Sequence, residues 1–148
     1  MPTNPTDDLL SLIHHGSHMA VQGYDEVIKD TRDEEIRRTL MQMQNLHKEV
    51  ALEASRRLQS AGAVPEEPHV LARVQVWANE GLRTLFDRSP ETLLKVLLDG
   101  ARMGLSGLED AIDRDFHAQG DVVEFAYRYR DGQRRQLEKL RELRRTLH

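Results

Sequence analysis

Residues 16–30, GSHMAVQGYDEVIKD, and residues 100–114, GARMGLSGLEDAIDR, decide the fold because they repeat one pattern. In each stretch a glycine is followed seven residues later by a second glycine. A large apolar residue, two acids, a small apolar residue, an isoleucine and a charged pair then follow in the same order. One half of the chain therefore reads as a divergent copy of the other half, which predicts two related helical units about a pseudo-twofold axis.

The composition indicates one soluble, mostly helical domain spanning residues 1–148. Charged residues make up 31% of the chain and hydrophobic residues 39%, whereas aromatic residues make up only 5%. An apolar content dominated by Leu, Val, Ala and Met favours helix over strand. The chain has no cysteine, which excludes disulfides, thiolate metal sites and cysteine nucleophiles, and no apolar run reaches the ~20 residues of a membrane span. We therefore expect a cytoplasmic protein.

Apolar residues recur at three- and four-residue steps along most of the chain, which predicts amphipathic helices. Asp33-Glu34-Glu35 suits a helix start, and Gly62 suits the end of that helix. Ser89-Pro90 is a strong restart signal, with serine as the N-cap and proline as the first helical residue. The predicted helices span about 7–30, 33–61, 69–87, 90–115 and 121–147.

The connections between these helices predict the topology. Short connections join the first two and the last two long helices, so each pair forms a hairpin. The predicted helix at 69–87 is long enough to carry the chain back along the bundle, since a helix rises ~1.5 Å per residue. The expected fold is an all-α, ferritin-like antiparallel four-helix bundle with a helical long crossover between helices 2 and 3.

Four local features also carry a resemblance to a known family. They are Gly23-Tyr24 on the first helix, Asp33-Glu34-Glu35-Ile36 at the start of the second, the loop AGAVPEEP at 61–68, and Val76-Trp77-Ala78-Asn79. With these features the chain resembles a group of uncharacterised bacterial ferritin-like four-helix-bundle proteins, known only as a domain of unknown function. The resemblance covers nearly the whole chain and implies the same bundle fold. The family usually has Gly-Glu on the third helix and a tyrosine further along, where this chain has Gly100-Ala101 and Leu108.

The positions that hold metal in ferritin-like proteins can be located through the repeat. That superfamily places a glutamate on each of the first and third helices, and a Glu-x-x-His pair on each of the other two. In this chain the six positions are Ser17, Gln44, His47, Ala101, Arg130 and Gln133. Since di-metal sites need carboxylates, and an arginine in the same layer opposes cation binding, the sequence predicts loss of the di-metal site and no cofactor.

Three histidines define the alternative hypothesis. His14 and His18 are four residues apart and share a helix face, and the first hairpin places His47 at about their height. Three imidazoles suit a zinc or copper site. The other interpretation makes His47 a hydrogen-bonded core histidine, which bonds Gln133 or Ser17 across the bundle, and leaves His14 and His18 solvated.

The glycines inside the predicted helices need an explanation, because each lowers the stability of its helix by up to ~1 kcal/mol relative to alanine. They are Gly16, Gly23, Gly100, Gly104 and Gly107. Their repeated spacing predicts a close approach of the first and third helices. On this interpretation the glycines serve packing rather than chemistry.

The C-terminal segment 128–148 is basic in an acidic chain. It carries eight basic side chains against three acidic ones, although the whole chain has a net charge of -4. Such a helix could contact nucleic acid, an anionic membrane surface or an acidic partner. It could equally be a solvated face that pairs with acids of the bundle, and no aromatic platform for bases accompanies the charge.

These observations lead to one expected function and two alternatives. The chain has no nucleophile-base-acid arrangement and no phosphate-binding glycine loop, so we expect no enzyme activity. The expected function is a non-catalytic scaffold that acts through self-association or a protein partner. The alternatives are a ferritin-like metal-binding protein that uses His14, His18 and His47, and a nucleic-acid-binding protein that uses its terminal helix.

Overall fold

The structure is a computed structural model that describes residues 4–63, 85–115 and 117–147. Over these residues the fold is all-α, with four helices and no strand. The helices are α1 (Pro5–Ile28), α2 (Glu34–Ser60), α4 (Pro90–Arg114) and α5 (Gly120–Thr146). The all-α class predicted from the sequence is confirmed.

Local capping explains where the helices begin. The side chain of Asp33 accepts a hydrogen bond from Ile36 N at 3.0 Å, and Ser89 accepts one from Thr92 N at 3.3 Å, with proline next in α4. Asn4 accepts one from Thr6 N at 2.9 Å, so α1 begins two residues before the predicted start at residue 7. After α2, Gly62 adopts a positive φ of 68°, a left-handed conformation that favours glycine.

The predicted helix at 69–87 falls almost entirely outside the described residues. Its last three positions, residues 85–87, are described and are not helical. Asp87 instead accepts hydrogen bonds from Ser89 N at 2.9 Å and from the Thr92 hydroxyl at 2.8 Å. These bonds form an irregular turn that leads into α4.

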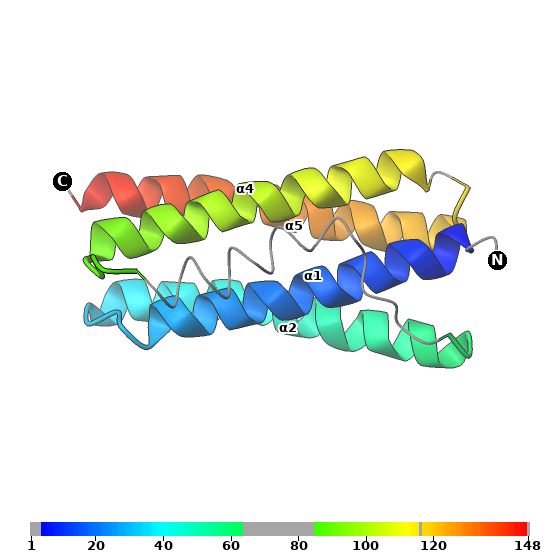
Figure 1. Ribbon diagram of the computed structural model, residues 1–148, viewed down its shortest axis with the longest axis horizontal. Helices are drawn as coiled ribbons and strands as arrows, with labels where there is room; N and C mark the ends of the chain where they lie inside the picture. Colours follow the sequence, from blue (N-terminus) through cyan, green and yellow to red (C-terminus); the bar gives the residue numbers. More distant parts are fainter. Residues whose placement is uncertain (1–3, 64–84, 116, 148) are drawn as a thin grey trace.

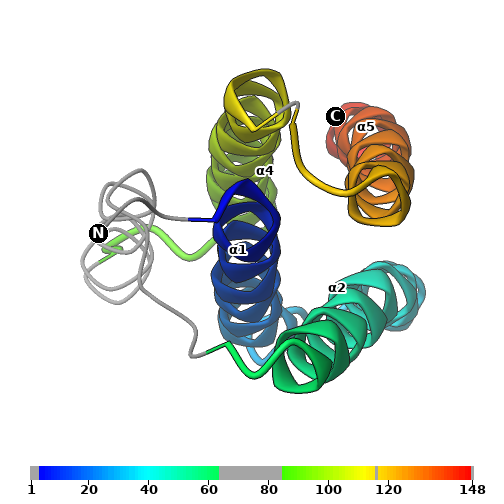
Figure 2. The same ribbon diagram turned by 90° about the vertical axis from the view of Figure 1, so that its right-hand side faces the viewer.

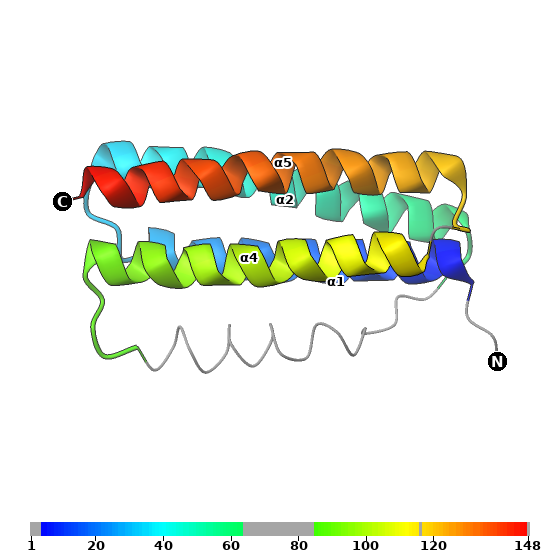
Figure 3. The same cartoon turned by 90° about the horizontal axis from the view of Figure 1, so that it is seen from above.

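The four helices lie side by side along one axis (Figures 1 and 3). In Figure 1, α1 and α5 run from the right-hand end to the left, and α2 and α4 run in the opposite direction. Seen end-on, α1 lies between α2 and α4, and α5 completes the group (Figure 2). The helix contacts agree, since α1 packs on α2 and α4, α5 packs on α4 and α2, and α1 also meets α5 across the middle.

The buried apolar side chains form two clusters rather than one continuous core. One cluster gathers Leu9, Ile13, Val50, Leu58, Ile112, Val122, Phe125 and their neighbours. The other gathers Val27, Ile36, Leu40, Met43, Leu94, Leu98, Leu140 and their neighbours. The chain segments of the two clusters lie toward opposite ends of the bundle, so the middle is built from other side chains. None of the described helices is both long enough and apolar enough to cross a membrane.

Three of the helical glycines do not serve the close packing that their spacing suggests. A Cβ added at Gly16 or Gly23 would meet nothing within 4 Å, and one at Gly104 would lie 3.7 Å from the Gln133 side chain. A Cβ at Gly132 would come within 2.8 Å of Leu46, so here α2 and α5 approach closely. The packing interpretation is therefore wrong for Gly16, Gly23 and Gly104.

Candidate functional site: an uncharged polar layer and its cavity

A network of four side chains links three helices between the two apolar clusters. The ring of His47, on α2, lies with Nδ1 2.7 Å from the Tyr129 hydroxyl and Nε2 2.7 Å from Gln136 Oε1. Tyr24, on α1, donates its hydroxyl to the same Gln136 oxygen at 3.1 Å. Gln136 Nε2 donates to the carbonyl of Met43 at 2.8 Å. Tyr24, Tyr129 and His47 are all buried.

The partners of His47 define one protonation state. Gln136 Nε2 faces a carbonyl, so its oxygen is the atom turned to the imidazole, and His47 Nε2 must donate. Burial favours the neutral ring, in which Nδ1 carries no proton and accepts from the Tyr129 hydroxyl. The network is therefore complete with a neutral imidazole, and a second ring proton would remove the acceptor for Tyr129.

Burial favours the uncharged form of all three titratable members of the network. Burial lowers the pKa of His47 to about 4, and the hydrogen bond to Gln136 opposes this only partly. Burial also raises the pKa of Tyr24 and that of Tyr129 well above their ordinary value. Each group is thus uncharged at neutral pH, which suits a layer enclosed by apolar clusters.

The expected hydrogen bond from His47 to Gln133 or Ser17 is wrong. Tyr129 and Gln136 occupy the two ring nitrogens. These two residues lie on α5 four positions before and three after residue 133, on the same helix face. Ser17 is fully buried but donates to the His14 carbonyl of its own helix at 2.9 Å.

The other positions aligned with the superfamily's metal ligands have local roles. Gln44 is buried and donates to the Val21 carbonyl at 2.9 Å and to Asp25 at 2.6 Å, which ties α2 to α1. Arg130 lies over the ring of Tyr127, with its guanidinium carbon 4.5 Å from the ring centre. Ala101 lines the central cavity.

The candidate metal ligands His14, His18 and His47 do not form a group that could hold a metal ion. Among the described residues no three His, Cys, Asp or Glu side chains are so arranged. His14 and His18 are neighbours, with ring centres 4.6 Å apart, and burial, followed by the charges of His18 and His15, lowers the pKa of His14. Both nitrogens of His47 are engaged in the polar layer. A metal role for these histidines stays a prediction.

A cavity of about 70 Å³ adjoins the polar layer. Its walls on α1 and α4 are mainly small residues and a few large apolar ones, and its floor is the polar layer from α2 and α5. The small residues are Gly16, Ala20, Gly23, Gly100, Ala101 and Gly104. Tyr24, His47, Tyr129, Gln133 and Gln136 supply the polar groups. No carboxylate, lysine or arginine lines the cavity among the described residues.

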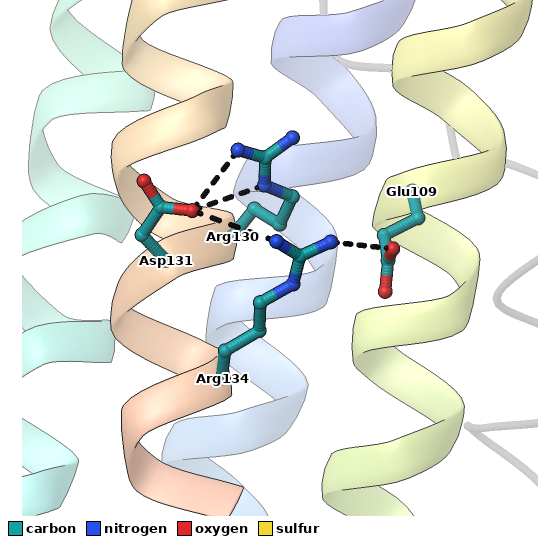
Figure 4. Close-up of polar contacts among 4 residues, drawn as sticks. All are labelled: Glu109, Arg130, Asp131 and Arg134. Atoms are coloured by element: carbon teal, nitrogen blue, oxygen red, sulfur yellow. Dashed lines mark hydrogen bonds and ion pairs between the residues drawn. The ribbon is translucent and has the colours of Figure 1, made fainter.

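The basic side chains of α5 are partly neutralised within the bundle. Arg130 bonds Asp131 at 3.0 Å, and Arg134 reaches Glu109 of α4 at 2.9 Å (Figure 4). Arg141 pairs with Glu138 one turn away, and Lys139 lies 4.0 Å from Glu142. These pairs favour a solvated, internally balanced face over a continuous cationic surface for nucleic acid.

Comparison with protein-family models, curated proteins and solved structures finds no match for this chain.

Sequence reasoning missed Tyr24, Tyr129 and Gln136 as partners of His47. Tyr129 and Gln136 lie seven residues apart in the last predicted helix, at positions that share one helix face, and Tyr24 follows the repeated glycine. A signal was available, because a buried histidine needs partners for both ring nitrogens and two tyrosines were on inward faces. The sequence alone does not show which turn of α5 packs against which turn of α2.

Proposed function

We propose that the chain is a ferritin-like bundle that has lost its di-metal site and functions as a non-catalytic scaffold, through association with a second copy of itself. An uncharged, hydrogen-bonded layer stands at mid-bundle, where ferritin-like proteins hold their metal ions. Metal-binding layers use carboxylates to balance cationic charge. The neutral network around His47 is the observation that carries the loss of the site.

The helix directions support the ferritin-like topology. α2 ends at one end of the bundle and α4 begins at the other end (Figure 1). A long crossover between the second and third bundle helices accounts for this separation, and adjacent helices then run antiparallel. A plain up-down-up-down bundle would place these two ends together.

A groove between α2 and α5 supports self-association. It has a volume of about 380 Å³ and a floor that includes Val50 and Phe125. On α2 it is lined by Glu49 and by Glu53, which pairs with Arg57 at 3.1 Å, and on α5 it is lined by Arg128. Glu49 is therefore the acidic rim, and Arg128 is the basic rim. A twofold axis through the groove would bring the acidic rim of one copy against the basic rim of the other, which is the self-complementarity that an isologous dimer requires.

Exposed apolar side chains lie on the same helix as the acidic rim. Leu52, three residues from Glu49, is 54% exposed, and Met41 is 48% exposed. A single exposed leucine is ordinary on a monomer. At about 100° per residue, Leu52 and Met41 lie about 100° or more around α2 from Val50 and Glu53, so they stand outside the groove. We therefore place the self-association surface on the groove between α2 and α5 itself.

A charge exchange across the groove tests this assignment. Glu49→Lys or Arg128→Glu alone is expected to weaken the dimer about tenfold, because each places like charges across the twofold axis. The double variant restores opposite charges and should recover most of the affinity, as measured by sedimentation equilibrium. Arg145→Glu, which lies on the same helix away from the groove, is the matched control and should leave the association unchanged. A monomeric parent protein at high micromolar concentration would contradict the proposal.

Metal content tests the loss of the site separately. Protein prepared without any immobilised-metal step is expected to contain far less than one equivalent of iron, manganese, zinc or copper. Elemental analysis of the dialysed protein measures this directly. About one equivalent of metal that disappears on substitution of His47 or His14 would instead support the histidine site.

A further inference from the structure

The central cavity has a wall that helix packing does not explain. Glycine inside a helix is unfavourable, and close approach of a neighbouring helix is its usual compensation. At Gly16, Gly23 and Gly104 no described residue supplies this compensation, because an added Cβ would meet no described atom or make only an ordinary contact. All three glycines line the cavity. Their common effect is therefore open volume beside the polar layer.

The cavity has a defined chemical character. Its described lining is mostly apolar, contains no formally charged side chain, and includes His47 in its neutral form. An ion would enter without a counter-charge, at a high desolvation cost. The described lining therefore selects against both anions and cations and favours a neutral molecule.

One polar group at the cavity remains available for hydrogen bonding. The side chains of Tyr24, Tyr129 and Gln136 are already hydrogen-bonded within the His47 network. The carboxamide of Gln133 also lines the cavity and has no hydrogen-bond partner among the described residues. Its oxygen points toward α4, 3.7 Å from the position of a Gly104 Cβ. Gln133 can thus both donate to and accept from a molecule inside.

We propose that this cavity binds a small, uncharged organic molecule that is apolar over most of its surface and carries one hydrogen-bonding group, which Gln133 recognises. The volume of about 70 Å³ is roughly half that of an engineered ~150 Å³ cavity that accepts benzene, so the ligand has about three or four non-hydrogen atoms. A short alcohol meets these conditions. The cavity shares Tyr129 with the groove between α2 and α5, but the variants that test it, at Gly104 and Gln133, lie outside that groove. This proposal and self-association can therefore fail independently.

Titration with 2-propanol, followed by methyl NMR spectroscopy, tests the site. The methyl groups of Ala20 and Ala101 line the cavity, and their resonances should shift saturably. The methyl group of Ala54, buried in the apolar cluster, is the internal control. Isopropylammonium has nearly the same shape with a positive charge, and acetate is a small anion. Both should bind at least about tenfold more weakly, because neither finds a counter-charge.

Two variants separate the volume from the hydrogen bond. Gly104→Ala adds a methyl group that fits the backbone but occupies the cavity, and should weaken 2-propanol binding at least about threefold. Gln133→Leu keeps a similar size and removes the polar group, and should weaken binding about twofold to tenfold. Absence of saturable shifts at Ala20 and Ala101, or equal binding of isopropylammonium, would overturn the proposal. Unchanged binding in Gly104→Ala would overturn it as well.

Discussion

Lowering the pH from 7 to 5 is expected to reduce the free energy of unfolding by about 2 kcal/mol through His47 alone. Burial lowers the pKa of this imidazole to about 4 in the folded protein, whereas the unfolded chain has the ordinary value near 6.5. Below pH 6.5 the unfolded state therefore binds a proton that the folded state excludes. The stabilisation is complete above that pH and is lost progressively as the pH falls toward 4.

Urea denaturation of the parent protein and His47→Gln, at pH 7, 6 and 5, measures this effect. Glutamine keeps one donor and one acceptor but has no titration, so its curve should lack the contribution of about 2 kcal/mol. At pH 7 the variant should be less stable by about 1–3 kcal/mol, because the partners of His47 are left imperfectly bonded. His18→Gln, at an exposed histidine, is the matched control and should keep most of the parent's slope. Parallel pH curves for the parent and His47→Gln would contradict the neutral network.

Among the described residues, no titratable neighbour is placed to stabilise the protonated form of His47. On α1 the facing group is Tyr24 and on α5 it is Tyr129, both held neutral by burial. On α4 the described cavity wall consists of Leu, Gly and Ala residues. A carboxylate in this layer would raise the pKa of the imidazole by stabilising its protonated form.

The helices could be predicted from the sequence because capping and amphipathic spacing are local properties. Ser89-Pro90 and Asp33 mark helix starts through their own side chains, and the α2 stripe from Ile36 to Leu58 is buried throughout. The partner of His47 could not be predicted in the same way. The spacing of residues within one helix shows which side chains share a face. Which turn of α5 meets residue 47 depends instead on the position of α5 relative to α2 along the bundle axis.

The glycines give a second instance of this limit. Their repeated spacing predicted a shared helix face, and Gly16, Gly23, Gly100 and Gly104 do line the cavity. The spacing could not distinguish a close contact between helices from an open cavity, because either one places glycine on the buried side of a helix. The true close approach occurs at Gly132, which lies outside the repeated phrase and packs on Leu46.

Replacing the three cavity glycines by alanine is expected to raise the free energy of unfolding by about 2–3 kcal/mol. Gly16→Ala and Gly23→Ala meet no atom within 4 Å, and Gly104→Ala makes an ordinary contact, so each keeps most of the ~1 kcal/mol helix preference of alanine over glycine. The three contributions should nearly add, because Gly16 and Gly23 lie seven residues apart on α1 and Gly104 lies on α4. The melting temperature should rise by roughly 4–10 °C.

Gly132→Ala is the matched control for this stabilisation. It has the same helix preference, but its Cβ would come within 2.8 Å of Leu46, whose side chain must move. The gain at Gly132 should therefore be smaller than at any of the three cavity positions. Equal or lower stability of the triple variant would show that open volume is not the reason for these glycines. If the triple variant gains stability and loses 2-propanol binding together, the glycines are kept at a cost in stability for the sake of the cavity.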